Sequence, residues 1–522
     1  MSAKSSSPSF VVSLPLRVSR KDEREIDVRF CLFNSLYNAT LGEFLRRLDQ
    51  MRNTPEWIAA RALPKLSLER PALFKAARER VQFSEYAAHA FVAETKNAAK
   101  WNEGRKHADP RVSANEAQKI ATRAFEAVER HALGQGGRPR FKGRGRGLQS
   151  IEGKSNKQGI RWNSSAGMLV WGSLTLPAVL PPDGRDPYLA EALQCPVKYA
   201  RLVRKIVKGR MRHFAQLILK GTPPVKYLSG EGKIVGLDAG PSAIGLFSDE
   251  FAGVVQLAPG VVQPWKETRR LQRKMDRSRR ATNPECYHED GTWKKGSRVQ
   301  VRSRHFEKTR SKLRETERVL AARRAREHGE VINKILALGA QVHAENLSYR
   351  AWQKRFGRSS KVRAVGMFME KLHRKAERAG GGVVDLNARS LRMSQLDPLT
   401  GVYRKKELSE RWHVLGDGSG VVQRDVLSAF LARCATRVDG QDAIHSSQID
   451  TIWPAANLLL RRAGWMREQP ASVASVEATA PKIPAPERVA RRRPLACSGS
   501  PENGSGKPAR DGVRTLALEG EE

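Results

Sequence analysis

The chain has 522 residues, of which 40% are hydrophobic, as expected for a globular protein of several domains. Its 94 Lys and Arg residues against 54 Asp and Glu residues give a net charge of +40, far beyond what solubility requires. This balance favours a polyanionic partner, and nucleic acid over a membrane surface. No apolar run approaches the length of a transmembrane helix, and the N-terminal residues lack a signal-peptide pattern, so we expect a soluble intracellular protein.

The cysteines are scattered along the chain, without a C-x-x-C pair or a companion histidine at zinc spacing. They are Cys31, Cys195, Cys286, Cys434 and Cys497. This pattern predicts free thiols in a reducing compartment.

The N-terminal part begins with a strand-like alternation over residues 10–18, and helical spacing of apolar residues follows from residue 23 to about 131. Short strand-like runs return at 159–162, 168–171 and 174–180. Because strands precede and follow the helical part, we interpret that part as an insertion into a β-barrel.

A basic, glycine-rich stretch occupies residues 134–147. Glycine lets a backbone approach phosphates closely, arginine and lysine supply charge, and an aromatic ring offers a stacking face. The candidate nucleic-acid contacts are Arg138, Arg140, Phe141, Lys142 and Arg144. The alternative is a flexible basic linker.

A second basic tract has helical spacing over residues 265–338, with an irregular interruption at 283–297. So much positive charge repels itself unless phosphates neutralise it, so we favour contact with a nucleic-acid duplex over a solvated helix face. The candidate contacts are Arg269, Arg273, Arg277 and Arg302.

Three acids follow elements that are predicted to be ordered. Asp238 follows a buried strand-like run, Glu345 ends another, and Asp425 begins a predicted amphipathic helix. Asp238 could instead cap the adjoining turn, and Asp425 could be a helix cap or a first-turn acid. Asp385 ends a third strand-like run, and we assign it no role.

These three acids could assemble at the edge of a mixed sheet. Such a carboxylate cluster suits phosphodiester hydrolysis, in which two Mg²⁺ ions about 4 Å apart activate water and stabilise the leaving 3′ oxygen.

The sequences Gly-Leu-Asp238-Ala-Gly, Ala-Glu345-Asn-Leu and Gln-Arg-Asp425-Val-Leu resemble the split RuvC nuclease of TnpB proteins from insertion sequences, and of the type V CRISPR effectors. Residues 136–142 resemble the Tyr-Pro-Arg-Phe-Lys signature of that family. Residues 366–372 resemble the helix after its second acid. The resemblance covers nearly all of residues 10–435.

One departure concerns the zinc ribbon, whose opening Thr-Ser-Gln is matched by Met393-Ser-Gln395. The family carries two C-x-x-C pairs there, whereas this chain has Asp397, Thr400, Val414 and Asp417. We therefore expect no zinc, and a segment that either stays loose or folds on apolar contacts. The apolar residues in question are Leu396, Leu399, Leu408 and Trp412.

The resemblance implies a multidomain α+β protein: a wedge β-barrel with a helical recognition insertion, then a split RuvC-like RNase H fold. The expected division is a wedge strand at 1–22, the helical domain at 23–133, the wedge barrel at 134–230, the nuclease at 231–392 and 423–466, the degenerate ribbon at 393–422, and a disordered tail at 467–522.

The function implied by the resemblance is RNA-guided cleavage of DNA, with guide RNA and target DNA as partners and Asp238, Glu345 and Asp425 as ligands of two Mg²⁺ ions. The implied location is the cytoplasm of a prokaryote, associated with the nucleoid. An RNA-guided binder that does not cut is the first alternative. A basic RNA-binding or chaperone protein is the second, and it leaves the three acids unexplained.

Overall fold

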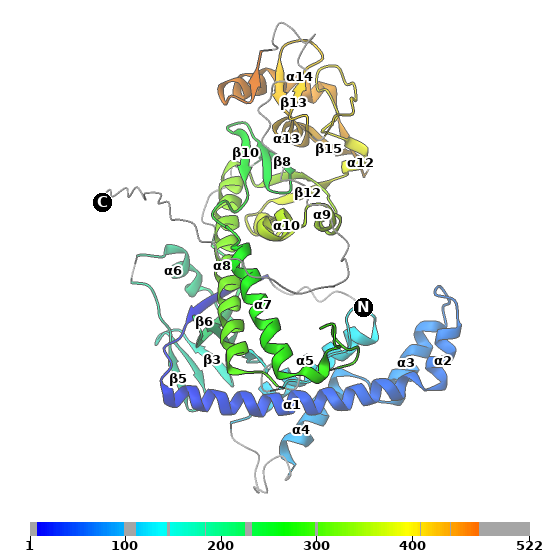
Figure 1. Ribbon diagram of the computed structural model, residues 1–522, viewed down its shortest axis with the longest axis vertical. Helices are drawn as coiled ribbons and strands as arrows, with labels where there is room; N and C mark the ends of the chain where they lie inside the picture. The colour runs from blue at the N-terminus through cyan, green and yellow to red at the C-terminus, as the bar shows by residue number, and fades with distance from the viewer. Residues whose placement is uncertain are drawn as a thin grey trace, which may run out of the picture. The chain divides into compact units, whose positions relative to one another are not determined.

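The computed structural model describes residues 8–98, 111–143, 147–182, 184–224, 232–297, 301–407, 409–438 and 440–468 (Figure 1). The chain divides into two units, Met1–Gln469 and Pro470–Glu522. The predicted disordered tail lies outside the described residues, apart from residues 467 and 468. None of the helices in the described ranges is long and apolar enough to cross a bilayer.

Two open sheets form the part predicted to be a wedge barrel. The first has the order β1-β7-β6-β2, with β1 at Ser9–Pro15, β2 at Ser150–Glu152, β6 at Val197–Val207 and β7 at Arg210–Lys220. The second has the order β3-β4-β5, with bounds Ile160–Asn163, Met168–Trp171 and Leu174–Pro177.

The prediction of a closed barrel is therefore wrong for the described residues. The strands of the second sheet are only four residues long and pair with one another. A single bridge, between Leu16 and Ala178, joins the chain after β1 to the chain after β5. One bridge cannot replace the continuous ladder that closes a barrel.

The predicted helical region is confirmed by a long first helix and the shorter helices packed on it. Ser19 caps α1 by accepting a hydrogen bond from the Asp22 backbone N–H at 3.1 Å. Apolar residues at helical spacing, such as Phe30, Phe33 and Phe44, form its buried face. The helices are α1 (Arg20–Arg52), α2 (Pro55–Ala62), α3 (Arg70–Arg80), α4 (Glu85–Asn97) and α5 (Ala114–Ala132), with α6 (Pro187–Gln194) following β5.

A five-stranded sheet with the order β10-β9-β8-β11-β12 forms the centre of the C-terminal half. Strands β8, β11 and β12 are parallel, whereas β9 and β10 are antiparallel to their neighbours. Their bounds are β8 (Ile234–Ala239), β9 (Ala243–Phe247), β10 (Ala252–Gln256), β11 (Gln341–Glu345) and β12 (Gly382–Leu386).

Helices cover both faces of this sheet. Val235 and Leu237 of β8 pack with α8 (Arg304–Leu338) and α11 (Val365–Arg378). The opposite face receives α13 (Arg424–Cys434). Helix α13 was predicted to be amphipathic, but most of its residues are buried, because it lies between the sheet and the elements that follow it.

The predicted basic helical tract is confirmed as α7 (Trp265–Thr282) and α8, which pack against each other (Figure 1). The predicted interruption contains the short helix η1 (Pro284–Cys286). The remaining helices are α9 (Tyr349–Arg355), α10 (Gly357–Arg363), α12 (Ala388–Leu391) and α14 (Ser446–Arg462).

The segment that resembles a zinc ribbon folds around a buried carboxylate. Asp397 Oδ1 accepts hydrogen bonds from the backbone of Leu399 and Thr400 and from the Thr400 hydroxyl, at 3.0–3.1 Å. Its Oδ2 accepts from His413 Nε2 at 2.9 Å and from the Gly416 backbone at 2.8 Å. The carboxylate thus joins the two halves of the segment, at a position where the family carries a cysteine.

Apolar contacts contribute as predicted, since Leu396 is buried and Leu399 packs against the same core. Leu408 lies outside the described residues. The strands here are β13 (Trp412–Val414) and β14 (Val421–Gln423), which pair with each other and with β17 (Met466–Arg467), and the separate pair β15 (Ala435–Val438) and β16 (Gln441–Ile444).

Candidate active site

Parallel strands position two of the predicted acids. The β8–β11 ladder pairs Gly236 with His343 and Leu237 with Ala344, so Asp238 and Glu345 are the next residues of the two strands. Side chains alternate along a strand, so Asp238 and Glu345 lie on the same face as Gly236 and His343. Both carboxylates therefore stand at the carboxyl end of the sheet, on the face that α13 covers.

Two glycines let α13 approach this face closely. A Cβ at Gly236 would lie 1.8 Å from the Ala429 carbonyl oxygen, and a Cβ at Gly245 would lie 2.1 Å from that of Asp425. Gly245 pairs directly with Asp238 across the β8–β9 ladder. The missing side chain of Gly245 thus makes room for the start of α13 beside Asp238.

Asp425 does not cap its helix. Gln423 is the N-cap, and its side-chain oxygen accepts the Val426 backbone N–H at 2.8 Å. The Asp425 carboxylate instead accepts a hydrogen bond from the Gln423 amide at 3.1 Å. Arg411 and Arg424 each lie 3.8 Å from one of its oxygens. Asp425 remains a first-turn acid, and its carboxylate is available to the sheet edge.

The three carboxylates repel one another. Burial is the main cause that raises the pKa of Asp238 well above its usual range, and the negative charges of Glu345 and Asp425 raise it further. Burial also raises the pKa of Glu345 to about 7. The structure therefore brings the three acids within electrostatic reach, although they lie on distant parts of the sequence.

The turn-capping alternative for Asp238 finds no support. The turn after β8 is closed by the backbone, with Gly240 N–H donating to the Ala243 carbonyl at 2.8 Å. Within the described ranges, no hydrogen bond or ion pair involves the Asp238 or Glu345 carboxylate. A partly buried carboxylate without a donor is costly unless a cation or a proton neutralises it.

The chemistry of the donors fits Mg²⁺, which prefers oxygen ligands such as carboxylates. Among the residues that the structure describes, no three His, Cys, Asp or Glu side chains are close enough to form a metal-binding group. The three carboxylates are thus neighbours without being a closed set of ligands. Asp385, to which we assigned no role, is 45% exposed and pairs with His373 at 3.3 Å.

Sequence reasoning missed several residues around the acids. Arg424 partly offsets the repulsion at Asp238 by lowering its pKa. Tyr349 also belongs here, because burial raises its pKa to about 12 and the charges of Asp385 and Glu345 add to the rise. The sequence signal for Arg424 was its position next to Asp425; Tyr349 had no such signal.

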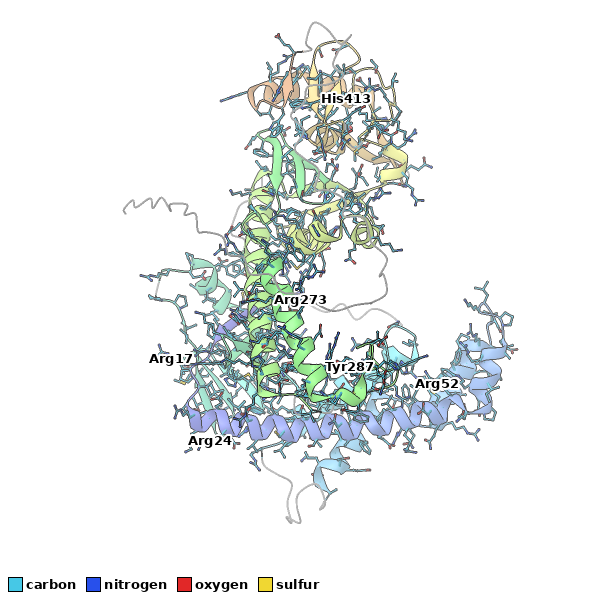
Figure 2. The ribbon with its side chains drawn as sticks, in the orientation of Figure 1. Arg17, Arg24, Arg52, Arg273, Tyr287 and His413 are labelled. Carbon is cyan, nitrogen blue, oxygen red and sulfur yellow. The ribbon has the colours of Figure 1, made fainter. Side chains whose placement is uncertain are left out.

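The basic residues of α7 form one exposed stripe. Arg269, Arg273 and Arg277 are spaced by four residues, which places them on one side of the helix. All three are exposed, and no ion pair to another described residue involves them. Arg273 lies midway along the helix (Figure 2). Arg302 differs, because it lies 3.5 Å from Glu307.

The basic, glycine-rich stretch lies along α1. Arg138 and Arg140 are exposed, and Arg138 forms a long ion pair with Asp49 at 3.9 Å. Lys142 is half-buried over the Tyr37 ring, and burial lowers its pKa. Phe141 is exposed, whereas Arg144 lies outside the described residues.

Comparisons with known proteins give two similar solved structures. A Cas12f1–sgRNA–target DNA complex aligns with 9% identity over 81% of this chain and 98% of that one, at a TM-score of 0.39. A CRISPR–Cas12f ternary complex aligns with 10% identity over 81% and 98% of the two chains, at a TM-score of 0.23. No protein-family model and no curated protein matches the chain. At these identities and TM-scores, the family expected from the sequence stays a prediction.

Proposed function

We propose that this protein is an RNA-guided DNA-targeting protein whose RuvC-like site hydrolyses phosphodiester bonds with Mg²⁺. The observation that carries the proposal is the convergence of Asp238, Glu345 and Asp425, with mutual repulsion that raises the pKa of Asp238. Perturbed carboxylates without hydrogen-bond donors indicate a site built for a cation. The sequence motifs around the same three acids specify which chemistry that cation serves.

Asp238 and Glu345 are rigidly held, because each belongs to a parallel strand of the central sheet. Asp425 is oriented by Gln423 and by the first turn of α13. When bound, Mg²⁺ would supply Lewis acidity and charge neutralisation at the scissile phosphate. Arg424 and Arg411 add positive charge beside the carboxylates, which favours approach of a phosphate.

The proposed partners are a guide RNA and a target DNA. The stripe of Arg269, Arg273 and Arg277 suits a phosphate backbone, since all three are exposed and without partners in the described ranges. Contacts of this kind hold a heteroduplex without reading its sequence. The net charge of +40 supports the same partner class.

The experiment is to express the full chain with its flanking DNA, sequence the RNA that copurifies, and incubate the complex with matching or scrambled duplex and Mg²⁺. We expect binding and cleavage of the matching duplex only. Asp238→Ala should bind the same duplex without cleaving it. Equal binding of matching and scrambled duplex would contradict RNA-guided targeting.

The second candidate is an RNA-guided binder that does not cut. One observation favours it: Gln423, Arg411 and Arg424 surround the Asp425 carboxylate and compete with a metal ion for its oxygens. The degenerate ribbon counts less for this candidate than its missing cysteines suggest, because Asp397 organises the segment without them. Guided binding by wild type without cleavage at any Mg²⁺ concentration would favour the binder.

A further inference from the structure

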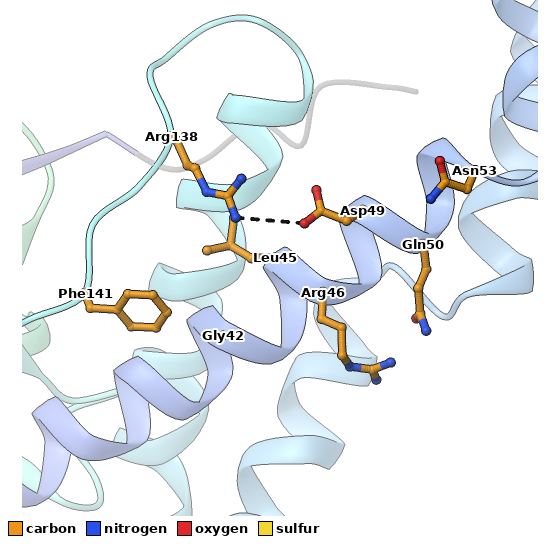
Figure 3. A pocket seen from close by; sticks show the side chains of 8 residues that line it. All are labelled: Gly42, Leu45, Arg46, Asp49, Gln50, Asn53, Arg138 and Phe141. Carbon is orange, nitrogen blue, oxygen red and sulfur yellow. Dashed lines mark ion pairs between the residues drawn. The ribbon is translucent and has the colours of Figure 1, made fainter. Parts of the chain in front are cut away.

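A pocket of about 430 Å³ lies between α1 and the basic stretch (Figure 3). This volume falls within the ~300–1,000 Å³ typical of small-ligand sites. The lining residues are Gly42, Leu45, Arg46, Asp49, Gln50, Asn53, Arg138 and Phe141. No residue of the carboxylate site lines it.

Two asparagines on α1 fix the chain beside this pocket. Asn38 makes a pair of hydrogen bonds with the Lys142 backbone, accepting its N–H at 2.7 Å and donating to its carbonyl at 2.9 Å. One helical turn earlier, Asn34 accepts the Leu148 N–H at 2.7 Å. The Lys142 ammonium rests 5.1 Å from the centre of the Tyr37 ring. This part of the basic stretch is anchored and is not a free linker.

The anchoring holds an aromatic ring at the wall of the pocket. Phe141 is 56% exposed although it adjoins the clamped Lys142. The ring faces Gly42 of α1, where an added Cβ would lie 3.6 Å from Phe141 Cε1 (Figure 3). A glycine at this position leaves the space beside the ring open. An exposed phenyl face held rigidly beside open space is suited to stacking with a flat partner.

The rest of the pocket supplies polar groups of both kinds. Arg138 and Arg46 contribute positive charge, and Asp49 contributes a carboxylate whose ion pair with Arg138 is 3.9 Å long. The Gln50 and Asn53 side chains have no hydrogen-bond partner within the part of the chain that the structure describes. Amide and carboxylate groups can together donate to and accept from the edge of a nucleobase.

We propose that this pocket holds one unstacked nucleobase of a nucleic-acid strand, with the base against Phe141 and the neighbouring phosphates near Arg46 and Arg138. The inference deepens the proposed function and rests on it for the identity of the strand. A base from the RNA and a base from the DNA offer the same chemistry, so the experiment distinguishes them. The carboxylate site takes no part in this contact.

The first measurement is ultraviolet crosslinking of the full chain with its copurified RNA and a matching DNA duplex, followed by mass spectrometry. We expect a crosslinked nucleotide on the peptide that contains Phe141, and its sugar identifies the RNA or the DNA as the source. Phe141→Leu should remove the crosslink, because it keeps an apolar side chain without a ring.

The second measurement is the affinity for the strand that crosslinks. Phe141→Leu should weaken binding about tenfold, and Phe141→Tyr should restore it. An abasic nucleotide at the crosslinked position should weaken wild type to a similar degree but add little to Phe141→Leu. The matched control is Tyr86→Leu on α4, whose ring is 86% exposed but does not line this pocket, and it should bind like wild type.

The proposal is overturned if Phe141→Leu binds both strands as tightly as wild type and gives the same crosslinks. Such a result leaves guided cleavage by wild type, and hence the proposed function, untouched. If no RNA copurifies, fluorescence anisotropy with single-stranded uridine and thymidine 12-mers replaces the affinity measurement. Equal affinities of wild type and Phe141→Leu for both 12-mers would then overturn the proposal.

Discussion

Two groups of buried or half-buried acids in the C-terminal half have opposite surroundings. Asp397 is 6% exposed and accepts five hydrogen bonds, from three backbone N–H groups, a hydroxyl and a histidine. In the described ranges, Asp238 and Glu345 accept none, and their charges repel. The first carboxylate is complete within the protein, whereas the others require something from outside.

This difference separates a structural acid from a functional one by physical criteria. A buried carboxylate with many donors stabilises the segment that supplies them. Carboxylates gathered without donors reduce stability unless a cation neutralises them. The residues that replace the family's cysteines thus belong to the first kind, and the residues that match its nuclease acids belong to the second.

The largest expected effect is on cleavage. Asp238→Asn and Glu345→Gln should each lower the cleavage rate of matching duplex by at least about 10³-fold, because each removes a charged ligand from the cluster. The matched control is Asp385→Asn on the neighbouring strand, which removes an exposed carboxylate and should cleave like wild type. If Asp385→Asn and Asp238→Asn lose cleavage equally, the distinction between these acids is wrong.

The next effect concerns the ribbon-like segment. Asp397→Ala should destabilise it by about 2–4 kcal/mol, because His413 and several backbone donors would be buried without an acceptor. Hydrogen–deuterium exchange of residues 412–423 reports the loss. Asp417→Ala is the control, since Asp417 is exposed at another expected cysteine position, and it should exchange like wild type. Faster exchange of wild type on adding a zinc chelator would contradict this role for Asp397.

A smaller effect tests how α13 reaches the sheet. Gly245→Ala should cost about 1–3 kcal/mol and reduce cleavage, because its Cβ would lie 2.1 Å from the Asp425 carbonyl oxygen. Gly382→Ala is the matched control on β12, where the nearest atom would be Gln341 Oε1 at 3.7 Å. Thermal unfolding and cleavage assays measure both variants. Normal stability and cleavage by Gly245→Ala would show that Gly245 is not required for the approach of α13.

Much of this organisation could be predicted from the sequence. Apolar runs placed strand β9 at its observed bounds and located β8 and β11, since buried strands have a clear compositional signal. The start of α13 followed from its apolar spacing. The electrostatic proximity of Asp238, Glu345 and Asp425 could be expected only through the family resemblance, because sheet order is a tertiary property.

Other features could not be predicted. The network around Asp397 depends on His413 and Gly416, which meet it only after the segment folds. The open wedge sheets depend on strand pairing, which the alternation of apolar residues does not encode. The close approach at Gly245 likewise follows from packing between distant elements.

The smallest effect is a pH dependence of metal binding. Glu345 has a folded-state pKa of about 7, above the ordinary value of 4.5. The unfolded chain therefore loses this proton first, and the stability that the protonated group contributes falls as pH rises from about 4.5 to 7. Below pH 7 a bound cation must displace the proton, so calorimetry should show Mg²⁺ affinity falling with pH. In Glu345→Gln this dependence should be weaker; an equal dependence would assign it elsewhere.

The most direct test of the carboxylate site is the melting temperature of the RNA-free protein as Mg²⁺ is added, for wild type and Asp238→Asn. Wild type should melt higher with Mg²⁺, because the cation neutralises the repelling acids. Asp238→Asn should melt higher than wild type without Mg²⁺, since it relieves the repulsion, and should gain less from the ion. Identical melting curves of the two proteins at every Mg²⁺ concentration would contradict a cation site at these acids.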